Sequence, residues 1–157
     1  MTAAIEAPAS GIGAVPMRVV DTWRAEPTGT GLAITARLRV DGDDPNLRGH
    51  FPGFPVLPGV FMVETLCQTM AQVTGPSTRL RRLHSVRFLA PLLAGDELTL
   101  DIDAVAVPDS GEREERSEAE PRSRERKAGS AWRVTAQGSR SDGTRAVSLK
   151  ADFGTEG

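Results

Sequence analysis

The 157-residue chain contains no tyrosine, only one cysteine and no long apolar run. With Cys67 alone, an intrachain disulfide is excluded and a reducing compartment is expected. No stretch of about 18 apolar residues is present, so the sequence predicts no membrane span. The N-terminus lacks a charged region followed by an apolar stretch, so we expect no secretory signal and a cytoplasmic protein. A formal net charge of −2 argues against nucleic acid or an anionic membrane as a partner.

Further absences limit the chemistry. No group of His, Cys, Asp and Glu has the spacing of metal ligands, so no metal is expected. No glycine-rich phosphate loop is present, and no cofactor is expected. We expect Cys67 to be a small core residue, because no base lies near it in the sequence. We expect His84, which lies on a predicted strand, to be a structural or surface histidine.

The most informative feature is a rigid loop that runs straight into an apolar helix. Prolines and glycines fix the backbone of the loop, which carries His50. The helix is predicted from about Pro58, a residue suited to the first turn, to about Val73. It is apolar around most of its circumference but carries Glu64, and a carboxyl group on a buried helix is rare unless it is paired or functional. Gln68 follows four residues later on the same face, where it can orient that carboxyl group.

His50 and Glu64 together resemble an acid/base pair delivered by two stiff elements. The plainer alternative is a loop histidine that bonds a nearby carbonyl, with a glutamate that faces solvent. The apolar character of the helix favours the functional interpretation.

The remaining pattern predicts strands. Apolar and polar residues alternate with period two over 32–40, which is typical of a strand with one exposed face. Further strands are predicted at 17–26, 83–88 and 98–107. A hairpin is predicted from 132–137 and 145–153, which flank an Asp-Gly turn. Strands around one long helix, without βαβ alternation, predict an α+β fold. Residues 1–16 are expected to be a flexible N-terminus, and 17–157 a single domain. Residues 109–129, rich in Glu, Arg and Ser, are expected to be a disordered insertion; partner docking is the alternative.

Residues 49–68 match every fixed position of a G-H-F-P-G-x-P-x-x-P-G-V-x-x-x-E-x-x-x-Q pattern, and 86–98 match a following R-F-x-x-P-x-x-x-G-D-x-L block. These motifs resemble the FabZ-like (3R)-hydroxyacyl-[acyl-carrier-protein] dehydratases. The resemblance implies the hotdog fold, an antiparallel sheet wrapped around one long central helix. It also implies a homodimer or a higher oligomer of dimers, with a heterodimer as the alternative, in which one protomer supplies the histidine and its partner the carboxyl group.

The implied enzyme is a hydro-lyase that converts (3R)-3-hydroxyacyl-ACP to trans-2-enoyl-ACP in type II fatty-acid or polyketide biosynthesis, polyene synthesis included. The substrate is held on the phosphopantetheine of an acyl carrier protein. His50 can take the C2 proton, and Glu64 can donate to the departing hydroxyl or only orient it while His50 performs both transfers. The backbone N–H of Gly59 is the candidate oxyanion donor, because a helix start offers unpaired N–H groups and glycine allows close approach. The predicted acyl tunnel is lined by Phe51, Phe54, Val60 and Phe61.

The chain departs from the family pattern in three respects. The span between Gln68 and Arg87 is short and lacks the tyrosine-bearing segment of typical family members. Phe54 occupies a position where the family often has a polar residue. The insertion at 109–129 is not a family feature. These departures indicate a specialised enzyme. Glu64, where related isomerases tend to have Asp, favours dehydration without isomerisation. Two rival functions remain, namely a hotdog acyl thioesterase and a non-catalytic acyl-binding subunit of a heteromeric dehydratase.

Overall fold

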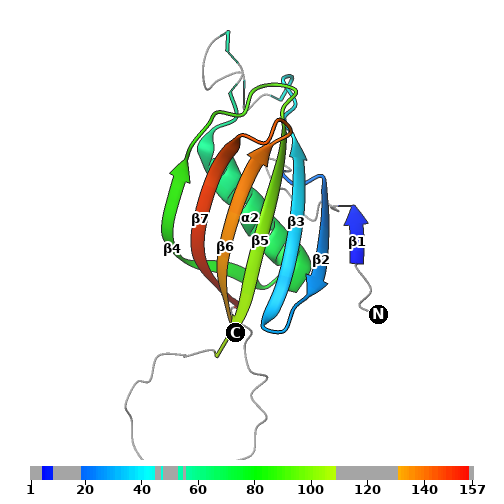
Figure 1. Cartoon of the computed structure of the whole chain (residues 1–157), viewed down its shortest axis with the longest axis vertical. Coiled ribbons are helices and arrows are strands. Elements are labelled where there is room, and N and C mark those ends of the chain that lie inside the picture. The colour runs from blue at the N-terminus through cyan, green and yellow to red at the C-terminus, as the bar shows by residue number, and fades with distance from the viewer. Residues whose placement is uncertain are drawn as a thin grey trace, which may run out of the picture.

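A computed structural model describes residues 5–8, 19–44, 47, 53–54, 56–108 and 131–155. In these residues, one antiparallel sheet of seven strands packs against one long helix, which confirms the α+β architecture (Figure 1). The strand order across the sheet is β1-β2-β3-β5-β6-β7-β4. The elements are β1 (Ile5–Pro8), β2 (Thr22–Pro27), β3 (Gly31–Arg39), α2 (Gly59–Thr74), β4 (Thr78–Phe88), β5 (Glu97–Val107), β6 (Ala131–Arg140) and β7 (Arg145–Thr155).

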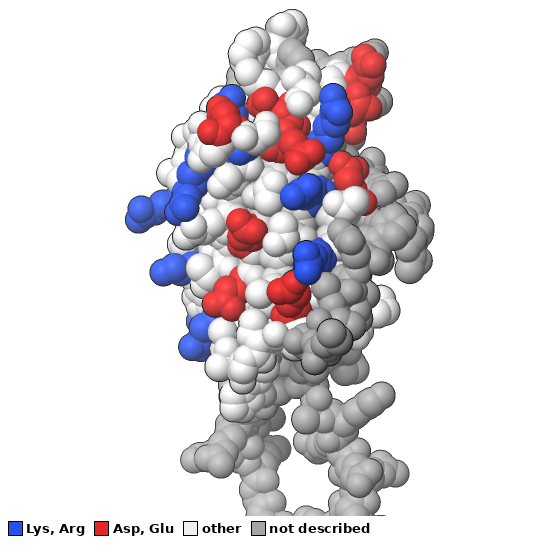
Figure 2. Space-filling view, turned by 45° about the vertical axis from the view of Figure 1, so that its right-hand side comes forward, with Lys and Arg blue, Asp and Glu red and all other residues white. Residues whose placement is uncertain are grey.

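The hydrophobic core lies between α2 and the inner face of the sheet. Helix α2 buries Met62, Leu66 and Met70 at four-residue spacing, which is the period of one helix face. The middle strands bury every second residue, as in the buried Leu98, Leu100 and Ile102 of β5. The opposite sheet face carries the polar residues that alternate with them, and charged side chains of both signs are scattered over it (Figure 2).

Helix α2 begins and ends close to the predicted residues. Pro58 immediately precedes the helix with an extended backbone, and Gly75 terminates it with a φ of 130° that favours glycine. Only residues 75–77 connect α2 to β4, so the chain turns directly from the helix into the sheet. Strand β4 lies at one edge of the sheet, where it pairs with β7. Its last residue, Phe88, contacts the start of α2.

Two predicted strands begin at other residues in the structure, and one further strand is not predicted from the sequence. Strand β4 begins at Thr78, five residues before the predicted start, because pairing with β7 organises an arginine-rich run that has no apolar alternation. Strand β2 begins only at Thr22, after the fully buried Val19 and Val20. Residues 5–8, within the terminus expected to be flexible, pair with β2 as strand β1. The insertion expected at 109–129 lies outside the described residues.

Candidate active site on helix α2

Three polar side chains form a stripe along one face of α2, and we call Glu64, Gln68 and Gln72 the polar stripe. Their four-residue spacing places them one above another on the helix. Gln68 Nε2 donates a hydrogen bond to Glu64 Oε1 over 3.1 Å, as the sequence predicts. Each side chain of the stripe is half-buried, so the stripe lies at the margin of the core and not in open solvent.

The polar stripe is bound to the segment that leads into β2. The backbone N–H of Val19 donates to Gln68 Oε1 over 3.2 Å, and Trp23 Nε1 donates to Gln72 Oε1 over 3.0 Å. A backbone N–H can only donate, so it fixes the amide oxygen of Gln68 towards Val19 and the NH2 group towards Glu64. The orientation of the carboxyl group is thus set by a main-chain atom from a distant part of the sequence.

Cys67 lies beside the carboxyl group but is not an activated nucleophile. Burial raises the pKa of its thiol to about 11, and the charge of Glu64 adds to this shift. A thiol with this pKa stays protonated near neutral pH, and the thiolate is the reactive form. The surroundings of the thiol therefore support the interpretation of Cys67 as a packing residue.

Gly59 is the first residue of α2, and the phenyl ring of Phe88 lies against it. A Cβ atom built on Gly59 would lie 2.9 Å from Phe88 Cζ, which is closer than real Cβ atoms approach. The sequence predicts that this glycine leaves room for a substrate. In the folded chain the room in the Cβ direction is taken by Phe88, a residue with no predicted role. The R-F-x-x-P block contains Phe88, but no periodic signal reveals its contact with Gly59.

The other predicted site residues differ in their exposure, and two of them are not described by the structure. Phe54, in the loop before the helix, and Val60, in the first turn of α2, are exposed, whereas Phe61 is half-buried and packs on the core. His50 and Phe51 lie outside the described residues, so their predicted roles stay predictions.

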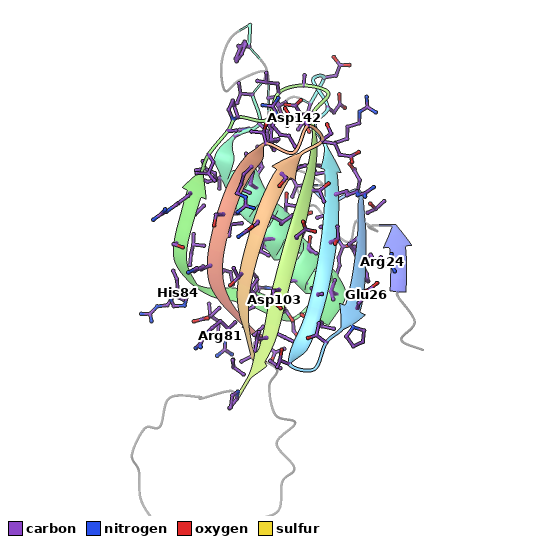
Figure 3. The ribbon with its side chains drawn as sticks, viewed as in Figure 1. Arg24, Glu26, Arg81, His84, Asp103 and Asp142 are labelled. Atoms are coloured by element: carbon purple, nitrogen blue, oxygen red, sulfur yellow. The ribbon has the colours of Figure 1, made fainter. Side chains whose placement is uncertain are left out.

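His84 belongs to a different part of the molecule. Its Nε2 lies 2.7 Å from Asp152 Oδ2 on β7, and both side chains are partly exposed (Figure 3). Asp152 alternates with the buried Ala151 and Phe153, so the pair lies on the outer sheet face, away from α2. This placement agrees with a surface histidine.

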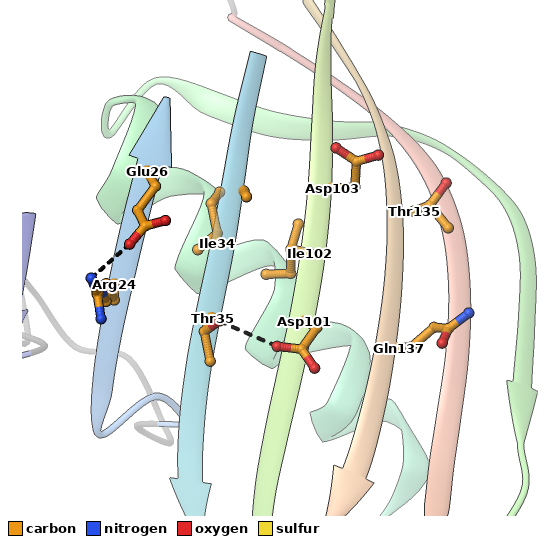
Figure 4. Close-up of a pocket in the computed structure, with 10 residues that line it drawn as sticks. Arg24, Glu26, Ile34, Thr35, Asp101, Ile102, Asp103, Thr135 and Gln137 are labelled. Carbon is orange, nitrogen blue, oxygen red and sulfur yellow. Dashed lines mark hydrogen bonds and ion pairs between the residues drawn. The ribbon is translucent and has the colours of Figure 1, made fainter. Parts of the chain in front are cut away.

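A hollow of about 500 Å³ also lies on the outer face and does not include the polar stripe (Figure 4). Charged and polar residues line it, among them Glu26, Asp101 and Asp103. Asp101 Oδ1 accepts a hydrogen bond from the hydroxyl of Thr35 across the strands. The hollow is a wide, solvent-open depression over strands whose inner residues pack on α2, so the sheet itself separates it from Glu64.

None of the helical segments in the described ranges is long and apolar enough to cross a bilayer. Among the same residues, no three His, Cys, Asp or Glu side chains gather as metal ligands would.

Comparison with known proteins gives consistent matches. Residues 26–113 match the model of the ApeI-like family, described as ApeI dehydratase. Two similar curated proteins are 3-hydroxyacyl-[acyl-carrier-protein] dehydratases FabZ. The one from Myxococcus xanthus is 40% identical over 84 residues, 48% of this chain and 55% of the relative. The one from Nitrosomonas europaea is 34% identical over 98 residues, 56% of this chain and 63% of the relative. The matches thus span between about half and two thirds of the curated relatives' length.

Solved structures confirm the hotdog fold. The dehydratase heterocomplex ApeI:P from Xenorhabdus doucetiae aligns with a TM-score of 0.53 and 22% identity, over 81% of this chain and 89% of that one. The (R)-hydratase from A. caviae involved in PHA biosynthesis aligns with a TM-score of 0.55 and 16% identity, over 80% of this chain and 96% of that one.

Proposed function

This chain belongs to the ApeI-like dehydratase family, and we propose that it dehydrates (3R)-3-hydroxyacyl thioesters carried on an acyl carrier protein. The observation that carries the proposal is the carboxyl group of Glu64, held by Gln68 on the half-buried stripe of α2. The FabZ relatives are named for this reaction on this class of substrate. The product is a trans-2-enoyl thioester, for fatty-acid or polyketide synthesis.

The start of α2 is the proposed binding site for the thioester oxygen. The first N–H groups of a helix have no partner within the helix and lie at the positive end of its dipole. The N–H of Gly59 is the first of these groups. A hydrogen bond from it to the thioester oxygen polarises the carbonyl and makes the C2 proton more acidic.

The elimination then needs one base and one acid. Neutral His50 takes the C2 proton, the C2–H electron pair becomes the C2=C3 double bond, and the C3–O bond breaks. The departing hydroxyl takes a proton and leaves as water. In one division of roles Glu64 is the neutral acid that donates this proton; in the other His50 returns the proton it received and Glu64 orients the hydroxyl. Protons move but no electron carrier is used, so the reaction needs no cofactor beyond the carrier's own phosphopantetheine.

Apolar side chains at the start of α2 are the proposed path of the acyl chain. Val60 is exposed there and Phe61 follows it, and the preceding loop adds the exposed Phe54 and, by prediction, Phe51. Because large exposed apolar side chains are costly in water, an exposed group of them is a candidate surface for an apolar ligand or a partner protein.

We place the dimer contact at β4. This strand pairs with β7 on one side, and large exposed apolar residues gather along it and beside it: Leu83, Phe88, Leu89 and Val60. An edge strand can pair with the same strand of a second chain, which would extend the sheet and bring His50 of one protomer to the partner's Glu64. The second chain is a copy of this one or a different hotdog subunit; the relative from Xenorhabdus doucetiae forms a heterocomplex.

The carrier protein is the remaining proposed partner, and we infer that the enzyme meets it in the cytoplasm. Strand β4 carries the exposed Arg79, Arg81, Arg82 and Arg87 and no acidic residue. Such a row of guanidinium groups favours an anionic partner, whether the phosphate of phosphopantetheine or acidic side chains around it.

The proposed activity is tested by incubating the purified protein with a (3R)-3-hydroxyacyl carrier protein and identifying the product by mass spectrometry. A dehydratase removes the mass of one water molecule and leaves the acyl chain attached to the carrier. Release of the free acid would identify a thioesterase, and an unchanged substrate would identify a binding subunit. Either of these two results would overturn the proposal.

A further inference from the structure

The ring of Phe88 covers the side of α2 at its first residue. A Cβ on Gly59 would lie 2.9 Å from Cζ and 3.0 Å from both Cε atoms, so the far edge of the ring points at the Gly59 Cα. Phe88 is nevertheless 51% exposed. One edge of the ring is thus fixed by the helix, and much of the remainder is available to a ligand or a partner.

The contact explains the glycine at position 59 without any special backbone conformation. Gly59 is not among the glycines with positive φ, and it lies within α2, where alanine is favourable. Steric room is therefore what this position requires, and Phe88 uses that room. Because Cβ and the amide nitrogen are bonded to the same Cα, the ring also lies beside the Gly59 N–H.

We propose that Phe88 is a specificity-determining residue that limits the width of the acyl chain at C2. The inference rests on the proposed function, in which the Gly59 N–H binds the thioester oxygen. C2 is bonded directly to the thioester carbonyl carbon, so a group beside that N–H lies beside the substituents of C2. The substrates assigned to this site are therefore 3-hydroxyacyl thioesters with no substituent at C2, and a C2 methyl group collides with the ring.

A pocket typically distinguishes one methyl or methylene group by about 10- to 200-fold. We expect selection of this order from the ring.

Leu89 provides a matched control. It follows Phe88 directly and is exposed to a similar extent, 53%, and none of the three atoms nearest to a Gly59 Cβ belongs to it. Truncation of either residue removes apolar surface from the proposed dimer contact. Only truncation of Phe88 opens the space beside Gly59.

The experiment compares kcat/KM for carrier-bound (3R)-3-hydroxybutanoyl and for both diastereomers of its 2-methyl analogue. We expect the wild type to prefer the unbranched substrate by about 10-fold or more, Phe88→Ala to reduce this preference at least about fivefold, and Leu89→Ala to keep it. If Phe88→Ala keeps the wild-type preference for the unbranched substrate, the proposed role of Phe88 is overturned. It is also overturned if both variants reduce this preference equally and both weaken the dimer. A wild type inactive on every substrate overturns the proposed function as well, so the two failures are distinguishable.

A second measurement tests the contact itself. Gly59→Ala should lower turnover of the unbranched substrate in the wild-type background, because the added methyl group displaces the ring. In a Phe88→Ala background the same substitution should cost little, since the backbone N–H of residue 59 is retained. Equal losses in both backgrounds would show that the substrate, and not Phe88, requires the glycine, and would overturn the inference.

Discussion

Gln68 donates a hydrogen bond to Oε1 of Glu64 over 3.1 Å while its own amide oxygen accepts the N–H of Val19 over 3.2 Å. The main-chain donor excludes a flipped amide, so the NH2 group is always presented to the carboxyl group. The bond from Gln68 thus holds Oε1 of Glu64 on the side of the polar stripe.

Gln68→Leu is expected to lower kcat by about 10- to 100-fold, because misplacement of a catalytic group by an ångström can cost that much. Gln72→Leu is the matched control: the same residue type, one turn further along α2, loses its bond to Trp23 Nε1 instead. Each variant leaves one donor, the Val19 N–H or the Trp23 Nε1–H, without its partner, which costs about 1–3 kcal/mol. Gln68→Leu also loses the bond to Glu64, so both melting temperatures should fall, that of Gln68→Leu somewhat further. Equal losses of turnover in the two variants would show that the polar stripe serves only stability.

The dimer contact at β4 is tested by Leu83→Asp, which places a charge among exposed apolar residues. We expect sedimentation to show a shift towards the monomer, and activity to fall with it, because His50 and Glu64 of one site are proposed to come from different protomers. Thr135→Asp adds the same charge on the exposed outer face of β6 and should leave the assembly intact. A wild type that stays fully active as a monomer would contradict the shared site.

Removal of residues 112–127, with a short glycine-containing turn in their place, is expected to preserve both activity and assembly. Val107 at the end of β5 is paired with Ala131 at the start of β6, so a short turn can join the two strands. A change in loop length of this size alters closure entropy by only about 1 kcal/mol. If the shortened enzyme lost activity on carrier-bound substrate yet kept it on a small thioester, residues 112–127 would be a docking element.

Cys67 is expected to react slowly with iodoacetamide at pH 8 in the native protein and quickly in denaturant. Burial raises its pKa from the ordinary value of 9.0 to about 11 and keeps the thiol protonated in the fold. The sign of the linkage follows: this contribution to stability is complete below pH 9 and is lost as pH rises through about 11. Denaturation curves of Cys67→Ala should lack this alkaline loss. Equal alkylation rates in the folded and unfolded states would contradict the burial of the thiol.

The sequence predicts the elements that depend on local pattern. The four-residue spacing of Met62, Leu66 and Met70 predicts α2 and its buried face, and the same spacing predicts the Gln68–Glu64 bond. The alternation in β5 predicts its inner and outer faces. The hotdog fold followed from two motifs whose spacing is specific enough to identify the family.

The features that the sequence does not predict depend on contacts between distant residues. The arginine-rich start of β4 forms a strand because β7 is adjacent to it, and no apolar alternation announces it. The bond between Val19 and Gln68 involves a main-chain N–H, which every residue other than proline has, so side-chain identity gives no signal. The contact between Phe88 at the end of β4 and Gly59 at the start of α2 joins residues far apart in the sequence, and residue types alone do not specify it.

The most direct test of the account compares the wild type with Glu64→Gln in the mass-spectrometric assay on (3R)-3-hydroxyacyl carrier protein. Glutamine keeps the shape of the side chain and can still bond Gln68, so the melting temperature should change little. It cannot supply an acidic proton, and loss of one proton-transfer group lowers turnover by about 10²–10⁴-fold. We predict rapid loss of one water molecule with the wild type and a rate lower by that factor with a folded Glu64→Gln. A folded variant that removes water at the wild-type rate would contradict the assignment of Glu64 to the active site.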